Sequence, residues 1–212
     1  MLLIKKGNKK GAIEMKQIMR LTIVVCIVVI SSSCSFKHVV SEDYSQYLVN
    51  NEGRYQLPYT DYVAEYVLTP NTVNHNYEFR AATVGYAHLW VVKFGEILEK
   101  TLQSNDLQRA FKQLSKAKDE GFSGVMIIKY NLINYEFEGF EAHVKLQITA
   151  LKSGTVIFDE TYFQIGISQG SKMFWGGPFG MKNAIQQSTK NALDKILAQS
   201  LNDMKFKMVS YQ

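Results

Sequence analysis

The chain has 212 residues and a formal charge of +5, and this positive charge is concentrated at its N-terminus. Residues 1–33 carry six of the 24 basic residues and one of the 19 acidic residues, so 18 of each remain after residue 33. The chain after residue 33 therefore has no formal net charge. It gives no support for binding nucleic-acid phosphates or an anionic membrane, because both need a cationic surface. We therefore predict no nucleic-acid partner.

The N-terminal segment has the order of residues found in an export signal. Lys16 and Arg20 precede about ten apolar residues, too few for the roughly 20 that a membrane-spanning helix needs. Three serines, residues 31–33, then place small side chains next to Cys34. This pattern resembles a bacterial lipoprotein signal, although the first of the serines stands where such signals commonly have leucine. The resemblance implies that residues 1–33 are removed and that Cys34 carries the lipid.

Two alternatives to lipidation remain open, an uncleaved N-terminal anchor and an ordinary signal peptide cut after Ser33. Cys26 competes with Cys34 as the lipidated residue, but it lies inside the apolar run and is better interpreted as a passive apolar residue. Once residues 1–33 are removed, Cys34 is the one cysteine left, which excludes an intramolecular disulfide and a thiolate zinc site. Residue 35 is serine, which resembles an outer-membrane address in enteric-type bacteria. Three methionines are candidate start positions: Met1, Met15 and Met19.

The remaining chain is long enough for one domain with its own core. We expect a polar tether over residues 34–60, where periodicity is weak, and a single domain over residues 61–206. Residues 207–212 form a short tail. Within the domain, residues 62–68 are typical of a short strand.

From Trp90 the apolar residues recur at helical spacing. A second run at the same spacing follows, and Ser104 between them is a candidate N-cap. We therefore predict helices from Trp90 to about Gly121. The residues that share the apolar faces are Val91, Phe94, Leu98, Leu107, Phe111 and Leu114.

Three strands follow, over residues 124–138, 140–151 and 155–165. The middle one alternates strictly between apolar and polar residues, so one of its faces should be exposed to water. Ser153 and Gly154 form a tight turn between the second and third strands. A final helix is predicted from Met181 to about Met204.

The predicted order is strand, helix, strand, strand, strand, helix. Consecutive strands joined by short turns pair antiparallel, and two amphipathic helices can cover one face of the sheet. We therefore predict an α+β fold, a two-layer sandwich with an antiparallel sheet of about four strands and the helices on one face.

This arrangement resembles small α+β accessory lipoproteins of the bacterial envelope. Members include the lipoprotein of the lipopolysaccharide translocon, the lipoprotein activators of penicillin-binding proteins and the auxiliary lipoproteins of ABC-type transporters. The resemblance is one of architecture, and it implies a non-enzymatic role in binding a larger envelope machine. The segments that carry it are Val84-Gly85, residues 94–98, Phe111 and Phe140 to Phe163 with its Ser153-Gly154 turn and the return over residues 159–162.

No motif predicts catalysis, a metal or a cofactor. The four histidines lack metal-ligand spacing, and the glycine-rich residues 166–180 match neither a P-loop nor a dinucleotide fingerprint. Glu136, Glu138 and Glu141 cluster at a turn, where solvated carboxylates are equivalent and unsuited to acid–base work. We predict that the protein is not an enzyme.

The glycine-rich segment also carries aromatic residues that could reach a partner. Phe174, Trp175 and Phe179 are the candidate partner-binding residues. The alternative is that they tuck beneath the loop as a small apolar cluster. The main functional hypothesis is a lipid-anchored accessory subunit of a multiprotein envelope assembly in the outer membrane, with its domain in the periplasm. The alternative is a lipoprotein that holds a small apolar or saccharide ligand. A hydrolase with an unrecognised site is a third, weaker hypothesis.

Overall fold

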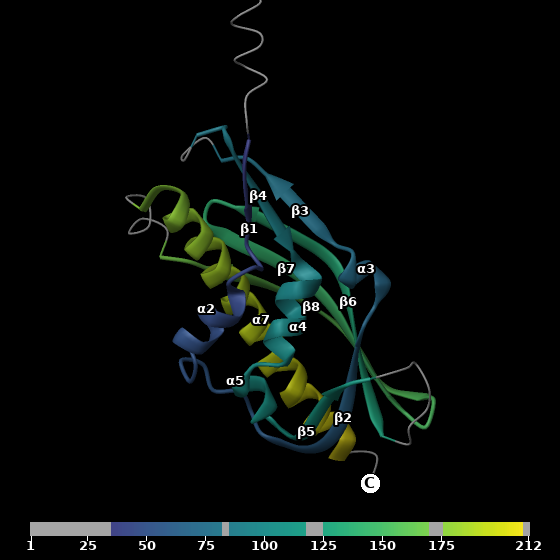
Figure 1. Ribbon diagram of the computed structural model, residues 1–212. Coiled ribbons are helices and arrows are strands. Elements are labelled where there is room, and N and C mark those ends of the chain that lie inside the picture. The colour runs from purple at the N-terminus through teal and green to yellow at the C-terminus, as the bar shows by residue number, and fades with distance from the viewer. Residues whose placement is uncertain (1–34, 82–84, 118–124, 170–175, 210–212) are drawn as a thin grey trace, which may run out of the picture. The chain divides into compact units, whose positions relative to one another are not determined.

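The computed structural model describes residues 35–81, 85–117, 125–169 and 176–209, and the chain divides into two units, residues 1–36 and 37–212. The second unit contains two β-sheets and a long C-terminal helix (Figure 1). The strands are β1 (Phe36–Val39), β2 (Thr60–Leu68), β3 (Asn76–Phe79), β4 (His88–Lys93), β5 (Phe111–Lys116), β6 (Met126–Glu138), β7 (Glu141–Lys152) and β8 (Thr155–Ile167). The helices are α2 (Tyr44–Asn50), α3 (Pro70–Val73), α4 (Phe94–Leu102), α5 (Asn105–Gln108) and α7 (Gly177–Val209).

The larger sheet has five strands in the order β5-β2-β6-β7-β8. Strands β6, β7 and β8 form an antiparallel meander, whereas β2 runs parallel to both β5 and β6. Two-residue turns join the meander, and all four of their residues have positive φ, as a type I′ hairpin turn requires: Gly139 at 58°, Phe140 at 67°, Ser153 at 50° and Gly154 at 80°. The predicted turn at Ser153 and Gly154 is confirmed.

The smaller sheet has three strands in the order β1-β4-β3. It packs on one half of β6 through aromatic pairs. The ring of Tyr77 lies 5.4 Å from that of Tyr135, and the ring of Phe79 lies 5.2 Å from that of Phe137. Such ring pairs stabilise the contact beyond the effect of the apolar area that they bury. The side of the five-stranded sheet that faces these elements is called the inner face below.

The long helix α7 crosses the inner face of β7 and β8. Tyr135 and Thr189 share a buried hydrogen bond of 2.9 Å, and Tyr162 donates a hydrogen bond of 2.8 Å to Asp203. The helix comes so close at Gly166 that a Cβ atom there would lie 1.8 Å from the carbonyl oxygen of Ser188. The residues of the predicted helical stripe are all buried: Ile185, Ser188, Ala192, Ile196, Ser200 and Leu201. The predicted C-terminal helix is therefore confirmed, and small residues in its stripe allow the close approach.

The α+β class is confirmed, but the predicted sheet is wrong in two respects. Two sheets of three and five strands replace one sheet of about four, and the larger sheet is mixed rather than antiparallel. The helices predicted from Trp90 to about Gly121 are right only in part. Helices α4 and α5 lie within this range, and Ser104 is the N-cap residue of α5. However, Trp90 and Val91 lie on β4, and Phe111 and Leu114 lie on β5 with both side chains buried. A spacing of three residues suits a helix, but here an irregular edge strand produces it.

The predicted tether is wrong over much of residues 34–60. Strand β1 and helix α2 occupy this segment, and Val40, Tyr44 and Leu48 are buried in the core. Its apolar residues are too sparse to give a periodic pattern, so only the tertiary contacts reveal that the segment belongs to the domain.

Candidate functional site

The predicted interaction residues fall in two groups. Cys34, Phe174 and Trp175 lie outside the described residues. Phe179 is described, and it lies in the first turn of α7 with 87% of its side chain exposed. It therefore does not tuck into the core.

The described residues offer a larger candidate surface, the outer face of the five-stranded sheet. Residues that pair directly across antiparallel strands lie on the same face. The inward residues of β7, such as Leu146 and Ile148, are fully buried. The outward residues alternate with them, so that His143, Lys145 and Gln147 pair with Ile165, Phe163 and Thr161 of β8. The outer face is therefore a mixed polar and apolar surface.

Strand β8 contributes most of the apolar area on this face. Phe163 and Ile165 follow one another along the outer side, and the ring of Phe163 meets that of His143 edge-on at 6.3 Å. Four apolar residues on the outer face are strongly exposed. Their exposed fractions are 40% for Val63, 54% for Val156, 54% for Phe163 and 57% for Ile167. Apolar residues spread among polar ones suit a protein-binding surface, whose total composition is close to that of the remaining surface.

The outer face also continues to a free strand edge, because β8 is the last strand of its sheet. One edge carbonyl, that of Ile165, accepts a hydrogen bond of 2.9 Å from Lys195 Nζ of α7. A lysine at an edge is a common device against uncontrolled strand pairing. Partner binding through the side chains of this face is therefore better supported than addition of a strand at this position.

The predicted acidic cluster lies at one end of the same face. Glu136 and Glu138 are exposed, and a Glu141 carboxylate oxygen lies 3.7 Å from His143 Nε2. Within the described ranges, no group of three or more acidic, histidine or cysteine side chains is arranged to hold a metal ion. The cluster therefore presents negative charge at the surface, where a partner could contact it.

A second cluster brings together two histidines that are 50 residues apart. His38 Nε2 and His88 Nδ1 share a hydrogen bond of 2.7 Å, and the ring of His38 stacks on that of Trp90 with centroids 4.4 Å apart. Burial first, then the neighbouring His88 and then Lys182 hold the pKa of His38 below its usual value. The contact needs one ring nitrogen to accept a hydrogen bond, so it favours the neutral form. This cluster fixes β1 to β4.

Among the described residues, three hollows with mixed polar and apolar linings lie around the segment that links α2 to β2. Their volumes are about 230, 320 and 130 Å³. The smallest contains a buried ion pair, in which Lys190 Nζ lies 2.6 Å from Asp194. Burial raises the pKa of Asp194, and the Lys190 charge opposes that rise. The side chains around it are Tyr47, Asn51, Arg54, Tyr55, Gln187 and Asn191.

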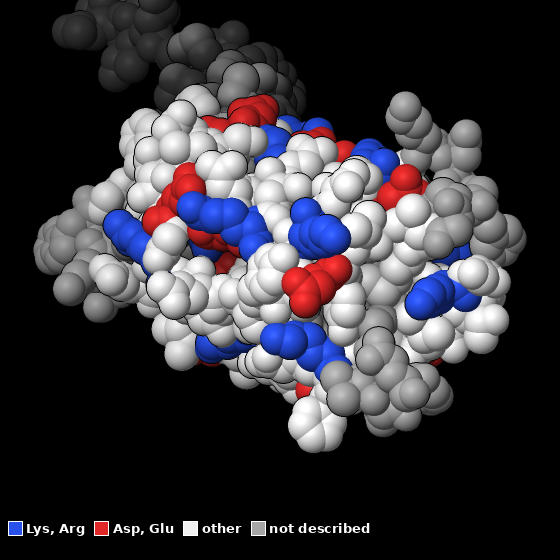
Figure 2. All heavy atoms as spheres, turned by 90° about the horizontal axis from the view of Figure 1, so that it is seen from below, with Lys and Arg blue, Asp and Glu red and all other residues white. Residues whose placement is uncertain are grey.

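Charged residues elsewhere are interspersed in sign. Figure 2 views the molecule from below and shows acidic and basic side chains side by side on the described part of that face. Several charged side chains of the domain form ion pairs, such as Lys207 with Glu160 and Lys116 with Glu99. This pattern agrees with the neutral composition after residue 33.

A local signal for the outer face is present in the sequence of β8. Residues 163, 165 and 167 are apolar on the side where residues 159 and 161 are polar, so the exposed stripe is visible in the sequence. The pairing of His38 with His88 has no such signal, because it depends on two strands that meet only in the folded chain.

Comparisons with known proteins do not indicate what these surfaces bind. No family model matches the sequence, and no curated protein matches it. Among solved structures, the chain is similar to the crystal structure of protein XCC0632 from Xanthomonas campestris, family model DUF330. The TM-score is 0.47 and the identity is 12%, with 74% of this chain and 91% of that chain covered. No helix in the described ranges is both long and apolar enough to cross a membrane.

Proposed function

We propose that this protein is a lipid-anchored accessory subunit of a multiprotein envelope assembly, acting by binding rather than catalysis. Its lipid is carried by Cys34, and its domain faces the periplasm from the outer membrane. The observation that carries the binding role is the outer face of the five-stranded sheet, where Phe163 and Ile167 are more than half exposed. Phe163, Ile165 and Ile167 follow one another along this face, and a contiguous exposed apolar patch is a candidate contact for a partner protein.

Co-purification tests the binding role. The full chain is expressed in its native host and recovered from detergent-solubilised envelopes, and bound proteins are identified by mass spectrometry. A double variant, Phe163→Ser with Ile167→Ser, should lose the partner because the outward apolar contact is removed. Phe206→Ser is the matched control, since Phe206 is also strongly exposed but lies near the end of α7. Recovery of the same partner by the double variant would refute the outer face as the contact.

Lipidation is tested separately by metabolic labelling with an acyl chain. The wild-type chain should incorporate the label, and Cys34→Ala should not. A wild-type chain that stays unlabelled would contradict the anchored role, whatever the co-purification shows.

A ligand-binding role for a saccharide has one supporting observation. Asn191 Oδ1 is buried without a hydrogen-bond partner among the described residues, and it lines the hollow that holds the Lys190–Asp194 pair. A polar hollow with tyrosine rings and an orphaned acceptor suits a hydroxyl-bearing ligand better than an apolar one. Chemical-shift changes at Asn191 on titration with simple sugars would support this role, and unchanged spectra would count against it.

A further inference from the structure

The domain begins very close to the proposed lipid. Lys37 is three residues after Cys34, and an extended chain spans at most about 3.5 Å per residue, so the two Cα atoms lie within about 10 Å of each other. Strand β1 is held firmly, because Val40 N donates a hydrogen bond of 3.0 Å to the Val91 carbonyl and His38 stacks on Trp90. An acylated Cys34 would therefore have no flexible tether behind it, and one end of the domain must stay at the bilayer surface.

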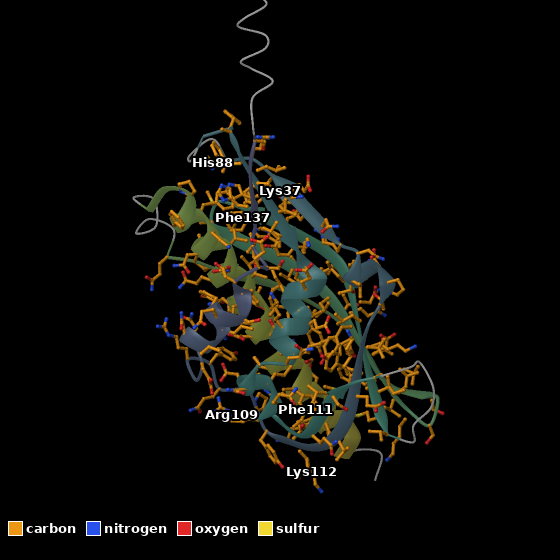
Figure 3. The ribbon with its side chains drawn as sticks, in the orientation of Figure 1. Lys37, His88, Arg109, Phe111, Lys112 and Phe137 are labelled. Carbon is orange, nitrogen blue, oxygen red and sulfur yellow. The ribbon has the colours of Figure 1, made fainter. Side chains whose placement is uncertain are left out.

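Two strongly exposed aromatic side chains lie at that same end. Tyr86 is 71% exposed and precedes β4 by two residues, next to the His38–His88 contact. Phe179 is 87% exposed and lies one turn before Lys182, whose Nζ lies 2.9 Å from a carboxylate oxygen of Asp43 in the turn that follows β1. Figure 3 labels Lys37 and His88 at this upper end, and it labels Arg109, Phe111 and Lys112 at the lower end.

We propose that this end of the domain, defined by Lys37, Tyr86 and Phe179 and called the anchor end, rests on the lipid surface with both aromatic rings in the headgroup region. The inference depends on the proposed lipidation of Cys34. Tyrosine and phenylalanine favour this region, because an apolar ring can enter the acyl boundary while polar neighbours stay in water. The exposed Lys37 adds attraction to anionic headgroups.

This placement also sets the direction in which the partner surface extends. Strands β7 and β8 run from the turn at Gly139 to the turn at Ser153 and back. A strand of 12 or 13 residues is about 40 Å long. The outer face would then stand up from the membrane, and a partner could contact it up to about 40 Å from the bilayer.

Depth-dependent quenching in vesicles tests the proposal. The lipidated full chain is labelled at single introduced cysteines, which is feasible because acylation consumes the Cys34 thiol and cleavage removes Cys26. The two test variants are Tyr86→Cys and Phe179→Cys. Each has a matched control: Tyr59→Cys, an exposed tyrosine whose carbonyl accepts a hydrogen bond from Lys205, and Phe206→Cys, equally exposed and 27 residues further along the helix. That separation corresponds to about 40 Å along α7.

Each labelled protein is reconstituted into phosphatidylethanolamine–phosphatidylglycerol vesicles that contain a nitroxide-bearing phospholipid. Quenching should be several-fold stronger at residues 86 and 179 than at residues 59 and 206. Equal quenching at all four positions, in protein whose acylation is verified by mass, would overturn the proposal while leaving the lipid anchor intact. Absence of the acyl mass would overturn the anchor and this inference together.

Discussion

The inner and outer faces of the five-stranded sheet are built from the same strands but differ in burial. On the inner face, Val144, Leu146 and Ile148 are fully buried beneath α7 and the smaller sheet. On the outer face, their neighbours in sequence remain accessible, and Phe163 and Ile167 stay more than half exposed. Alternation along the strands separates buried residues from exposed ones, so substitutions on the two faces should differ in how far they change stability.

The largest expected effect is on the inner face. Leu146→Ala should lower the free energy of unfolding by about 2–5 kcal/mol, because it removes buried methyl groups and leaves a cavity. Val156→Ala on the outer face is the control and should change it by less than about 0.5 kcal/mol. Urea unfolding followed by circular dichroism measures both values. Similar losses in the two variants would mean that something covers the outer face.

The second prediction concerns the contact between the inner face and α7. Gly166→Ala should cost about 1–3 kcal/mol, because the new Cβ would collide with the backbone of Ser188 and force the helix away. The control is Gly176→Ala, where nothing lies within 4 Å of the added atom. Thermal unfolding of both variants is informative, since a stable Gly166→Ala protein would show that α7 does not seat closely on β8.

A smaller effect is expected from pH. The free energy of unfolding should depend on the protonation of His38 in strand β1. The pKa of His38 in the folded protein lies below its usual value of 6.5, so the unfolded chain binds more protons as the pH falls below 6.5. The stability contributed by His38 is therefore complete above pH 6.5 and decreases as the pH falls towards the lower folded pKa. His75, whose pKa burial also lowers, should add a change of the same sign.

Unfolding free energies at pH 7.5 and 5.5 measure this dependence. His38→Gln should reduce the difference between the two values, because one titrating group is removed while His75 remains. An unchanged difference would mean that the His38–His88 contact does not require a neutral ring.

The smallest effect on stability is expected on the outer face itself. Phe163→Ser should change the free energy of unfolding by no more than about 0.5 kcal/mol, since its ring is already half exposed. Its effect should appear in partner recovery instead. A large loss of stability would assign Phe163 to the folded core and remove the clearest candidate contact on this surface.

Local patterns predicted the parts of the fold that depend on neighbouring residues. The alternation in β7 predicted its buried and exposed faces, and the glycine after Ser153 predicted a turn that needs positive φ. The stripe around Ile185 predicted α7. Phe179 was predicted as a contact residue, and the structure leaves it exposed, but its role remains a prediction.

Other features needed contacts between distant parts of the chain. Phe111 follows Leu107 at helical spacing, yet it becomes a strand residue because β5 pairs in parallel with β2 about 50 residues earlier. Nothing near β2 in the sequence encodes that pairing, since parallel partners must be joined by a long crossover. The burial of Tyr44 likewise depends on elements that follow it in the chain.

The sequence by itself determined the even balance of basic and acidic residues after residue 33, an alternating meander and a long final helix, because charge, period and turn chemistry are local properties. Only the tertiary structure decided that β2 makes the sheet mixed and that residues 37–50 belong to the domain. It also brought His38, Tyr86 and Phe179 to one end. These features arise from packing between distant segments, whose free energy no short stretch of sequence carries.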